Sequence, residues 1–233
     1  MPKRYWWVII TYFIMQYSAL VVVPFTDLIP FNDADILIFW TIFSFGLGLV
    51  IVLLLMRPDM KMGSARDASG AGQIILWSFL GLFMAYFGQG LAALIEMEVL
   101  GIDPGSENTQ QIMDIARYSP LFMIVPAIIG PILEEIIFRK IIFGAFYKRM
   151  NFFFAALLSS FVFAIVHNDP QHLLMYITMG LVFAFLYVKT KRIIVPIIVH
   201  AAMNSLVIFA QYNMDPEEIE RILNELQFIF FGG

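Results

Sequence analysis

The chain lacks cysteine, and only 14% of its 233 residues are charged. Without cysteine there is no disulfide, no thiolate nucleophile and no cysteine-ligated zinc site, so any metal would bind through His, Asp or Glu. Histidine is scarce too, with three copies in the sequence. No basic patch with interleaved aromatic residues is present, which argues against a nucleic-acid partner.

Apolar side chains are in excess and make up 61% of the sequence. Soluble domains are roughly 45–50% apolar and about 25% charged, so the composition is typical of a membrane protein. A transmembrane helix needs about 20 mostly apolar residues. We expect seven spans, at residues 5–25, 35–56, 73–95, 119–147, 152–167, 172–190 and 193–213. The predicted fold class is an all-α polytopic membrane helix bundle of about seven transmembrane helices.

The predicted spans divide the chain into three parts. Residues 1–118 hold three spans and their loops, and residues 119–213 form a core of four helices. In residues 214–233 the apolar side chains recur on one helical face, opposite acidic residues. We predict an amphipathic tail helix there, which either lies at the membrane interface or packs as a cap outside the membrane.

Charged residues in the loops alternate in sign. Lys3 and Arg4 precede the first span, and further basic clusters stand at 57–66, 148–149 and 189–192. The intervening loops are acidic or lack basic residues, except for Arg117 in an acidic loop. Basic loops face the cytoplasm. We therefore predict an integral protein of a membrane, expected to be a bacterial cell membrane, with a cytoplasmic N-terminus and the first apolar run retained as a span.

Two adjacent glutamates, Glu134 and Glu135, lie inside the fourth run, followed by Arg139. An ionisable group at the centre of a transmembrane helix costs about 2.5–3.5 kcal/mol on insertion scales and therefore faces a partner or a wet cavity. Glu135 and Arg139 share a helical face in the order that favours an ion pair. Glu134 points about 100° away and has no base within reach on its own helix. A structural ion pair explains Glu135 better than Glu134.

Phe163 and His167 are four residues apart, so they share a helical face. His167 ends its helix, because Asn168, Asp169 and Pro170 interrupt the pattern. A histidine at a helix C-terminus is either a structural cap, favoured by the helix dipole, or part of a site. His172 begins the next span, and we interpret it as interfacial and not catalytic.

His200 and Asn204 also share a face, about eight residues into the last span. Packing through the small residues between them does not explain two strong hydrogen-bonding groups one turn apart. Ser159 and Ser160 lie in the fifth run without the G-x-S-x-G context of a serine nucleophile. We interpret these serines as packing residues.

One acid, two imidazoles and one amide thus occupy defined faces of three of the last four spans. This set suits the activation of water. A buried carboxylate can act as a general base, because burial raises its pKa toward the working pH. An imidazole can relay the proton. Donors from His200 and Asn204 can stabilise the oxyanion that forms when a peptide carbonyl becomes tetrahedral.

These three pieces resemble the CPBP intramembrane proteases, the family of CAAX proteases and bacteriocin-processing enzymes. The family pattern EExxxR stands here at Glu134–Arg139, FxxxH at Phe163–His167 and HxxxN at His200–Asn204. The resemblance covers about residues 119–210. Lys140 departs from it, because members often have glycine after the arginine.

The resemblance implies an intramembrane endopeptidase with a core of four helices. Glu134 and His167 would activate the water, and His200 with Asn204 would hold the oxyanion. The residues implied to support the site are Glu135, Arg139 and Phe163. The expected partners are the lipid bilayer and a membrane-embedded, lipidated or hydrophobic peptide substrate.

The resemblance leaves the cofactor open, because the family has been described both with and without a metal. Glu134, His167 and His200 have the composition of a zinc site with two histidines and one carboxylate, but the H-E-x-x-H motif is absent. We expect no obligatory metal, with zinc as the possible alternative.

Two other functions fit the same residues. A proton-coupled transporter would string its polar groups along a path across the bilayer. A non-proteolytic member of the family would act as a scaffold, in immunity or in regulation.

Geometry adds one expectation. The depths of His167 and His200 match only if the fifth span ends near mid-membrane or the helices tilt, so we predict that residues 168–171 are buried in protein, lining a cavity.

Overall fold

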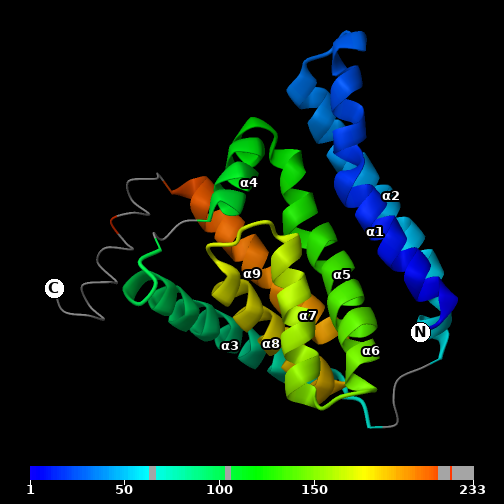
Figure 1. The fold of residues 1–233 in the computed structure, drawn as a ribbon, viewed down its shortest axis with the longest axis vertical. Helices are drawn as coiled ribbons and strands as arrows, with labels where there is room; N and C mark the ends of the chain where they lie inside the picture. Colours follow the sequence, from blue (N-terminus) through cyan, green and yellow to red (C-terminus); the bar gives the residue numbers. More distant parts are fainter. Residues whose placement is uncertain (63–66, 103–105, 215–220, 222–233) are drawn as a thin grey trace.

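The computed structural model describes residues 1–62, 67–102, 106–214 and 221, and all regular structure in these ranges is helical (Figure 1). The α-helices are α1 (Lys3–Val22), α2 (Asp33–Lys61), α3 (Ala71–Glu98), α4 (Glu107–Tyr118), α5 (Gly130–Glu134), α6 (Gly144–Tyr147), α7 (Phe152–Val166), α8 (Leu173–Thr190) and α9 (Ile194–Asn213). The 3₁₀-helices are η1 (Val23–Leu28) and η2 (Pro120–Met123), and the π-helices are η3 (Val125–Ile129) and η4 (Glu135–Phe143). The predicted tail helix lies outside the described residues.

The predicted membrane bundle is confirmed. Six helical segments in the described residues are long and apolar enough to cross a bilayer: Lys3–Leu28, Asp33–Lys61, Ala71–Glu98, Pro120–Tyr147, Leu173–Thr190 and Ile194–Asn213. The seventh apolar helix, α7, has 15 residues. At 1.5 Å per residue it is about 22 Å long, short of the roughly 30 Å hydrocarbon core.

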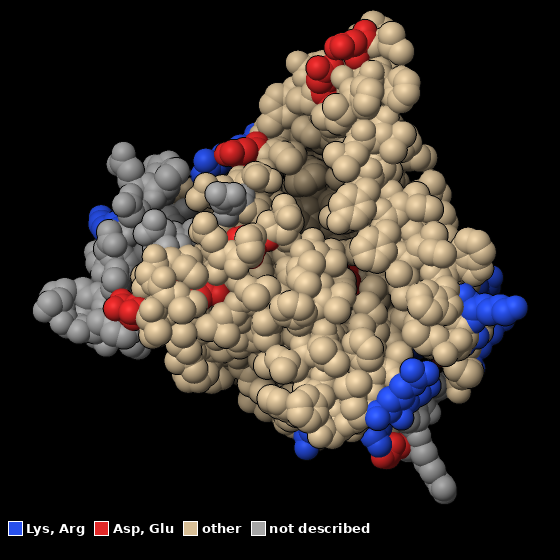
Figure 2. Space-filling view, viewed as in Figure 1, with Lys and Arg blue, Asp and Glu red and all other residues tan. Residues whose placement is uncertain are grey.

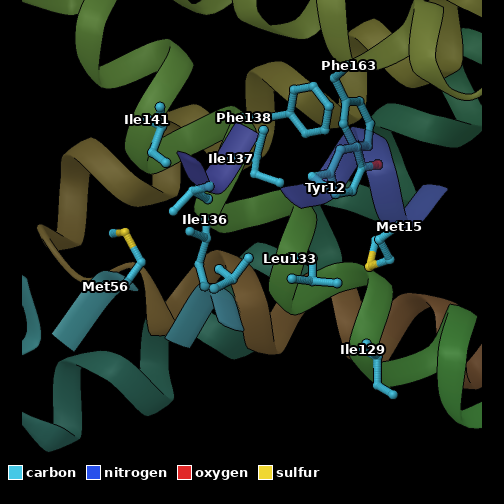
Figure 3. Packing of buried hydrophobic residues seen from close by; sticks show 12 residues of the cluster. Tyr12, Met15, Met56, Ile129, Leu133, Ile136, Ile137, Phe138, Ile141 and Phe163 are labelled. Carbon is cyan, nitrogen blue, oxygen red and sulfur yellow. The ribbon is translucent and has the colours of Figure 1, made fainter. Parts of the chain in front are cut away.

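Pro120–Tyr147 is the central segment of the bundle. In its most apolar window 61% of the residues are buried, compared with 11–33% in the other five candidate spans. Figure 3 shows side chains of α1 and α2 packed around it. The buried cluster there includes Tyr12, Met15, Met56, Leu133, Ile136, Ile137, Phe138, Ile141 and Phe163. The other helices therefore hold this segment in the protein interior, which explains how it carries charged residues.

The sequence pattern predicts one continuous span at the central segment. In the structure this segment is not one continuous α-helix. Two proline residues, Pro126 and Pro131, lack the N–H group that an α-helix needs, and the chain forms the π-helix η3 between η2 and α5. A second π-helical stretch, η4, contains Glu135 and Arg139. π-Helical turns are rare and occur frequently at functional sites.

The sequence pattern does not predict helix α4, whose residues lie in a predicted acidic loop. Ser106 caps the helix by accepting a hydrogen bond from the Thr109 N–H at 3.2 Å. Its apolar residues Ile112, Met113 and Ala116 follow helical spacing, and the last two are buried. The signal was weak because the helix is short and its first turn is polar.

Helices α7 and α8 pack closely at Ser160 and Gly180. A Cβ atom on Gly180 would lie 2.9 Å from the Cα atom of Ser160. The neighbouring Ser159 donates a hydrogen bond to the Phe138 carbonyl at 2.7 Å. Both serines are buried, in agreement with their interpretation as packing residues.

We expect Gly180→Ala to lower the free energy of unfolding by about 1–3 kcal/mol, because an overpacked backbone contact cannot relax easily. The matched control is Gly90→Ala in α3, where no heavy atom lies within 4 Å of the new Cβ. That variant should gain about 0.5–1 kcal/mol, because alanine is the better helix residue. Thermal unfolding of the purified protein in detergent measures both. Equal melting temperatures for the two variants would contradict the close contact.

Acidic and basic residues are unevenly distributed along the bundle, although Asp59 and Asp67 lie at the basic end, paired with Arg4 and Lys191. Figure 2 shows acidic residues at the tip of the α1–α2 hairpin and basic residues toward the other end of the molecule. At the basic end, Arg192 Nε donates to the Ser69 carbonyl at 3.0 Å. Basic residues lie at the end of the bundle that holds the N-terminus, as expected if this end faces the cytoplasm. The orientation of the protein in the membrane stays a prediction.

Candidate active site

Glu134, His167 and His200 come together from three segments of the bundle. His167 Nε2 lies 3.8 Å from Glu134 Oε2, and His200 Nε2 lies 3.7 Å from the same oxygen. Glu134 ends α5, His167 caps the C-terminus of α7, and His200 lies in the second turn of α9. Both distances exceed a direct hydrogen bond, so the three groups face one another at close range without a direct hydrogen bond between them.

Each imidazole is oriented through its Nδ1 atom. His167 Nδ1 lies 2.8 Å from the Phe163 carbonyl oxygen, which only accepts, so this nitrogen carries the proton. His200 Nδ1 lies 3.0 Å from Glu135 Oε1 in the interior. When the rings are neutral, both Nε2 lone pairs point toward Glu134. Hydrogen bonds at one ring nitrogen determine the role of the other in this way.

Glu135 and Arg139 form the buried ion pair expected from their spacing. Arg139 Nε lies 3.2 Å from Glu135 Oε2, and the two side chains are 1% and 0% exposed. Among the described residues, the guanidinium nitrogens and Glu135 Oε2 have no partner that meets hydrogen-bond geometry. The guanidinium instead lies over the rings of Phe163 at 4.3 Å and Phe183 at 5.2 Å. Charge and cation–π contact, rather than aligned hydrogen bonds, hold the pair.

Aromatic rings surround the two histidines. Phe163 lies 4.3 Å from the His167 ring, between centroids, and Tyr176 of α8 lies 4.4 Å from it. Phe183 stacks on His200 at 4.8 Å. Tyr176 was missed in the sequence, because one tyrosine in an apolar run carries no periodic signal. These rings limit how the imidazoles can rotate.

Asn204 is oriented by the break in the central segment. Its Nδ2 atom donates to the Pro126 carbonyl at 2.9 Å. Gly130 donates its N–H to Val125, and Pro131 has no N–H, so the Pro126 carbonyl lacks a helical donor from these positions. One amide hydrogen of Asn204 is used in this bond. The other remains available to a ligand.

Glu134, His167, His200 and Asn204 face one cavity of about 730 Å³. Its walls come from α1, α2, α3, α4 and the central segment as well as from the helices that carry the site. Figure 2 shows the surface hollowed between the α1–α2 hairpin and the rest of the bundle. The volume is within the range of roughly 300–1,000 Å³ typical of ligand sites.

The expectation for residues 168–171 is largely wrong. Asn168, Pro170 and Gln171 are exposed, and only Asp169 is buried. Asp169 accepts a hydrogen bond from Ser106 Oγ at 2.6 Å, which ties the turn to the start of α4. The short α7 brings His167 to the cavity without burying the whole turn, and Asn168 also lines the cavity.

His172 is buried and is not among the residues that line the cavity at Glu134. Its Nδ1 lies 3.0 Å from Oε2 of Glu96, a buried acid at the end of α3. Oε1 of Glu96 accepts the backbone N–H groups of Leu174 and Met175, so it caps the start of α8. The sequence pattern does not single out Glu96, because this residue directly follows the predicted third span and begins a predicted acidic loop. Its signal was its place in an otherwise apolar helical run.

Glu134, His167 and His200 supply the kinds of donor atom that bind metal ions. Two imidazole nitrogens and one carboxylate match the ligand types of catalytic zinc, and the Nδ1 contacts are those that orient metal-binding histidines. In residues 1–62, 67–102 and 106–214, however, no three His, Asp or Glu side chains are arranged as a metal site.

Comparison with known proteins shows similarity to membrane proteases. Residues 116–206 match the family described as "Type II CAAX prenyl endopeptidase Rce1-like". The chain is 46% identical over 243 aligned residues to "Putative membrane peptidase YdiL" of Bacillus subtilis (strain 168), covering 100% of this chain and 99% of that protein. It is 31% identical over 233 residues to "Membrane-embedded CAAX protease MroQ" of Staphylococcus aureus (strain USA300), covering 95% and 94%. No solved structure matches the chain with statistical significance.

Proposed function

Because the chain belongs to the Rce1-like family of type II CAAX prenyl endopeptidases, among the CPBP intramembrane proteases, we propose that it is an intramembrane endopeptidase. The reaction is hydrolysis of a peptide bond by a water molecule that Glu134 and His167 activate. The observation that carries this proposal is the position of both imidazole Nε2 atoms within 3.8 Å of one Glu134 oxygen. The substrate is a membrane-embedded, lipidated or hydrophobic peptide.

Glu134 acts as the general base. A water molecule between Glu134 and His167 donates one hydrogen to the carboxylate and the other to the free Nε2 lone pair. Its own lone pair then points at the substrate carbonyl carbon. Attack forms the C–O bond and transfers a proton to Glu134, which returns it to the leaving nitrogen as the C–N bond breaks.

Asn204 and His200 stabilise the oxyanion. The second amide hydrogen of Asn204 is available because Pro126 takes only one. His200 donates through Nε2 only when both ring nitrogens are protonated. Glu135 accepts the bond from Nδ1 and thereby orients the ring. Preorganised donors of this kind are effective because they need no rearrangement as charge develops.

Gathering of the polar groups around one point supports hydrolysis over the transporter alternative, which requires a path of such groups across the bilayer. The chain is an integral membrane protein, by its apolar helices and its membrane-protein relatives. We further propose that its N-terminus is cytoplasmic.

His167→Ala and His200→Ala test the function directly. Each should lower the rate of peptide cleavage by roughly 10²-fold or more, the scale of general acid–base catalysis. The assay uses purified protein in lipid vesicles with hydrophobic peptides, and mass spectrometry identifies the products. The third histidine supplies the control: His172→Gln should keep activity per folded molecule, because His172 pairs with Glu96 away from Glu134. Full activity in both alanine variants would contradict the proposal.

We propose that no metal is obligatory. Dialysis against 1,10-phenanthroline or EDTA should leave the cleavage rate within about twofold, because the proposed proton transfers use side chains alone. The measurement compares dialysed protein with and without added zinc. Loss of activity on chelation and its return with zinc would instead assign Glu134, His167 and His200 as ligands.

A further inference from the structure

His167 depends on packing for its position more than His200 does. Its Nδ1 atom bonds to a carbonyl of its own helix, that of Phe163, at 2.8 Å. His200 Nδ1 instead lies 3.0 Å from the buried carboxylate of Glu135 in another segment. His167 also caps the C-terminus of α7, and the next residue, Asn168, has a left-handed φ of 51° that turns the chain out of the helix. Because helix ends fray, contacts from other helices must fix the His167 ring.

Tyr176 of α8 supplies such a contact. Its ring lies 4.4 Å from the His167 ring, between centroids, at an angle of 32°. Phe163 lies 4.3 Å from the same imidazole at 58°. The two aromatic rings also contact each other edge to face, with centroids 6.4 Å apart. The imidazole therefore contacts two rings that support each other, and the ring of Tyr176 comes from a different helix.

The hydroxyl group of Tyr176 reaches the first turn of α4. Asn108 Nδ2 donates to the Tyr176 hydroxyl oxygen at 3.4 Å, a long hydrogen bond. Ser106, the N-cap of the same helix, donates to Asp169 Oδ2 at 2.6 Å. Asp169 follows His167 by two positions in the chain. The start of α4 thus holds both the ring that packs on His167 and the turn that follows this histidine.

A tyrosine suits this position because its two parts meet different partners. The apolar ring packs on the imidazole, and a buried tyrosine hydroxyl usually finds a hydrogen-bond partner. Phenylalanine would keep the ring contact and lose the bond to Asn108, whereas leucine would lose both. Tyr176 also lines the cavity, so an effect through His167 has to be distinguished from direct contact with a substrate.

We infer that Tyr176 is a positioning residue for His167, given the peptidase function proposed above. Its ring holds the imidazole with Nε2 facing Glu134, and Asn108 and Ser106 tie this arrangement to α4. A displacement of about 1 Å at a reacting group can cost 10²-fold in rate. Tyr176 therefore affects turnover strongly although it acts through another residue.

The kinetic test compares two substitutions at Tyr176, with full-length protein in vesicles and one hydrophobic peptide. Tyr176→Leu should lower kcat by roughly 10²-fold, and Tyr176→Phe by roughly two- to fivefold, the scale of one long hydrogen bond. KM should stay within about twofold, because the lost interaction serves the transition state. A raised KM with unchanged kcat would assign Tyr176 to substrate contact and overturn the inference.

Tyr187 provides the matched controls for both substitutions. It lies on the same helix, contacts Phe143 and is not among the residues that line the cavity. Tyr187→Phe and Tyr187→Leu should keep kcat per folded molecule. If they lower kcat as much as the Tyr176 variants do, the effect belongs to α8 as a whole and the inference fails.

Nuclear magnetic resonance of the imidazoles gives a readout that needs no turnover. The sequence has three histidines, so the three Cε1–Hε1 signals of protein with isotope-labelled histidine can be assigned by single substitutions. A stacked ring shifts such a signal through its ring current. Tyr176→Leu should move the His167 signal, whereas Tyr176→Phe and Tyr187→Leu should leave it close to its wild-type position. An unmoved His167 signal in folded Tyr176→Leu would contradict the positioning role.

The two readouts separate this inference from the proposed function. If the His167 signal moves as expected but no form of the protein cleaves a peptide, the positioning of His167 stands and the proposed hydrolysis fails. If Tyr176→Leu cleaves slowly while the His167 signal is unmoved, hydrolysis stands and the positioning role is refuted.

A double-mutant cycle tests the connection to α4. Asn108→Ala removes the hydrogen-bond donor and Tyr176→Phe removes the acceptor, so both single variants lose the same bond. The double variant should then have the kcat of the slower single variant, because residues that share one bond are not additive. Asn108 also lines the cavity. Losses that multiply in the double variant would show that it acts on the substrate independently, and would rule out the connection through Asn108.

Discussion

Glu134→Gln should reduce peptide hydrolysis by roughly 10²–10⁴-fold, the contribution expected of a general base. Glutamine has the shape of glutamate but cannot accept the proton from water. The carboxyl oxygen lies 3.7–3.8 Å from both imidazoles, so the substitution removes the one proton acceptor common to them. The measurement is the initial rate of peptide cleavage per folded molecule in vesicles, with melting temperature and detergent elution volume as checks on folding.

Glu134→Asp separates position from charge. It keeps the carboxylate but moves it back by one methylene, and a displacement of about 1 Å at a reacting group can cost 10²-fold. We expect a partial loss of rate. Asp27→Asn is the matched carboxyl-to-amide control, because Asp27 is exposed in η1, away from the cavity lining. The base is misassigned if Glu134→Gln and Asp27→Asn cleave equally fast. A scaffold without proteolysis would show no cleavage even in the wild type.

Arg139→Ala should lower the free energy of unfolding by about 3–5 kcal/mol, because it leaves a buried carboxylate without its cation. The pair is almost fully buried, and Arg139 also contacts the Phe163 ring. Glu135→Ala should lower the free energy of unfolding by a similar amount, because it leaves the buried guanidinium of Arg139 without its anion. The four tryptophans provide a fluorescence signal for thermal unfolding in detergent.

The double variant Glu135→Leu with Arg139→Met distinguishes stability from turnover. Replacing both charges by apolar side chains of similar volume is often neutral or stabilising, so most of the lost stability should return. Activity should stay low, because His200 loses its Nδ1 partner. A double variant that regains both stability and turnover would show that Glu135 does not orient His200. Wild-type stability in Arg139→Ala alone would refute a structural role for the pair.

Much of the fold could be predicted from the sequence. Long apolar runs require helices in lipid because main-chain groups must pair internally, and the seven apolar helices follow from that rule alone. The pairing of Glu135 with Arg139 was equally accessible, because it depends on neighbouring positions in one segment. Helix α4 was missed because a short helix with a polar first turn derives its stability from packing.

The candidate site was predictable only as a set of residue types on helical faces. Spacing indicated that Glu134, His167, His200 and Asn204 each faced something polar, and the family resemblance brought them together as a hypothesis. Their common depth could not be read from the spans, because it depends on the length of α7 and on how the helices cross. The partly exposed turn at 168–171 shows the limit of inferring depth from span ends.

The sequence by itself determined which segments enter the membrane and which polar side chains must find partners there, because those costs are local. Tertiary structure alone decided which residues become those partners. Glu96 meets His172 across 76 positions, and Asn204 meets Pro126 across 78. Such contacts arise from the packing of distant helices and from carbonyls freed at proline, which no local pattern encodes.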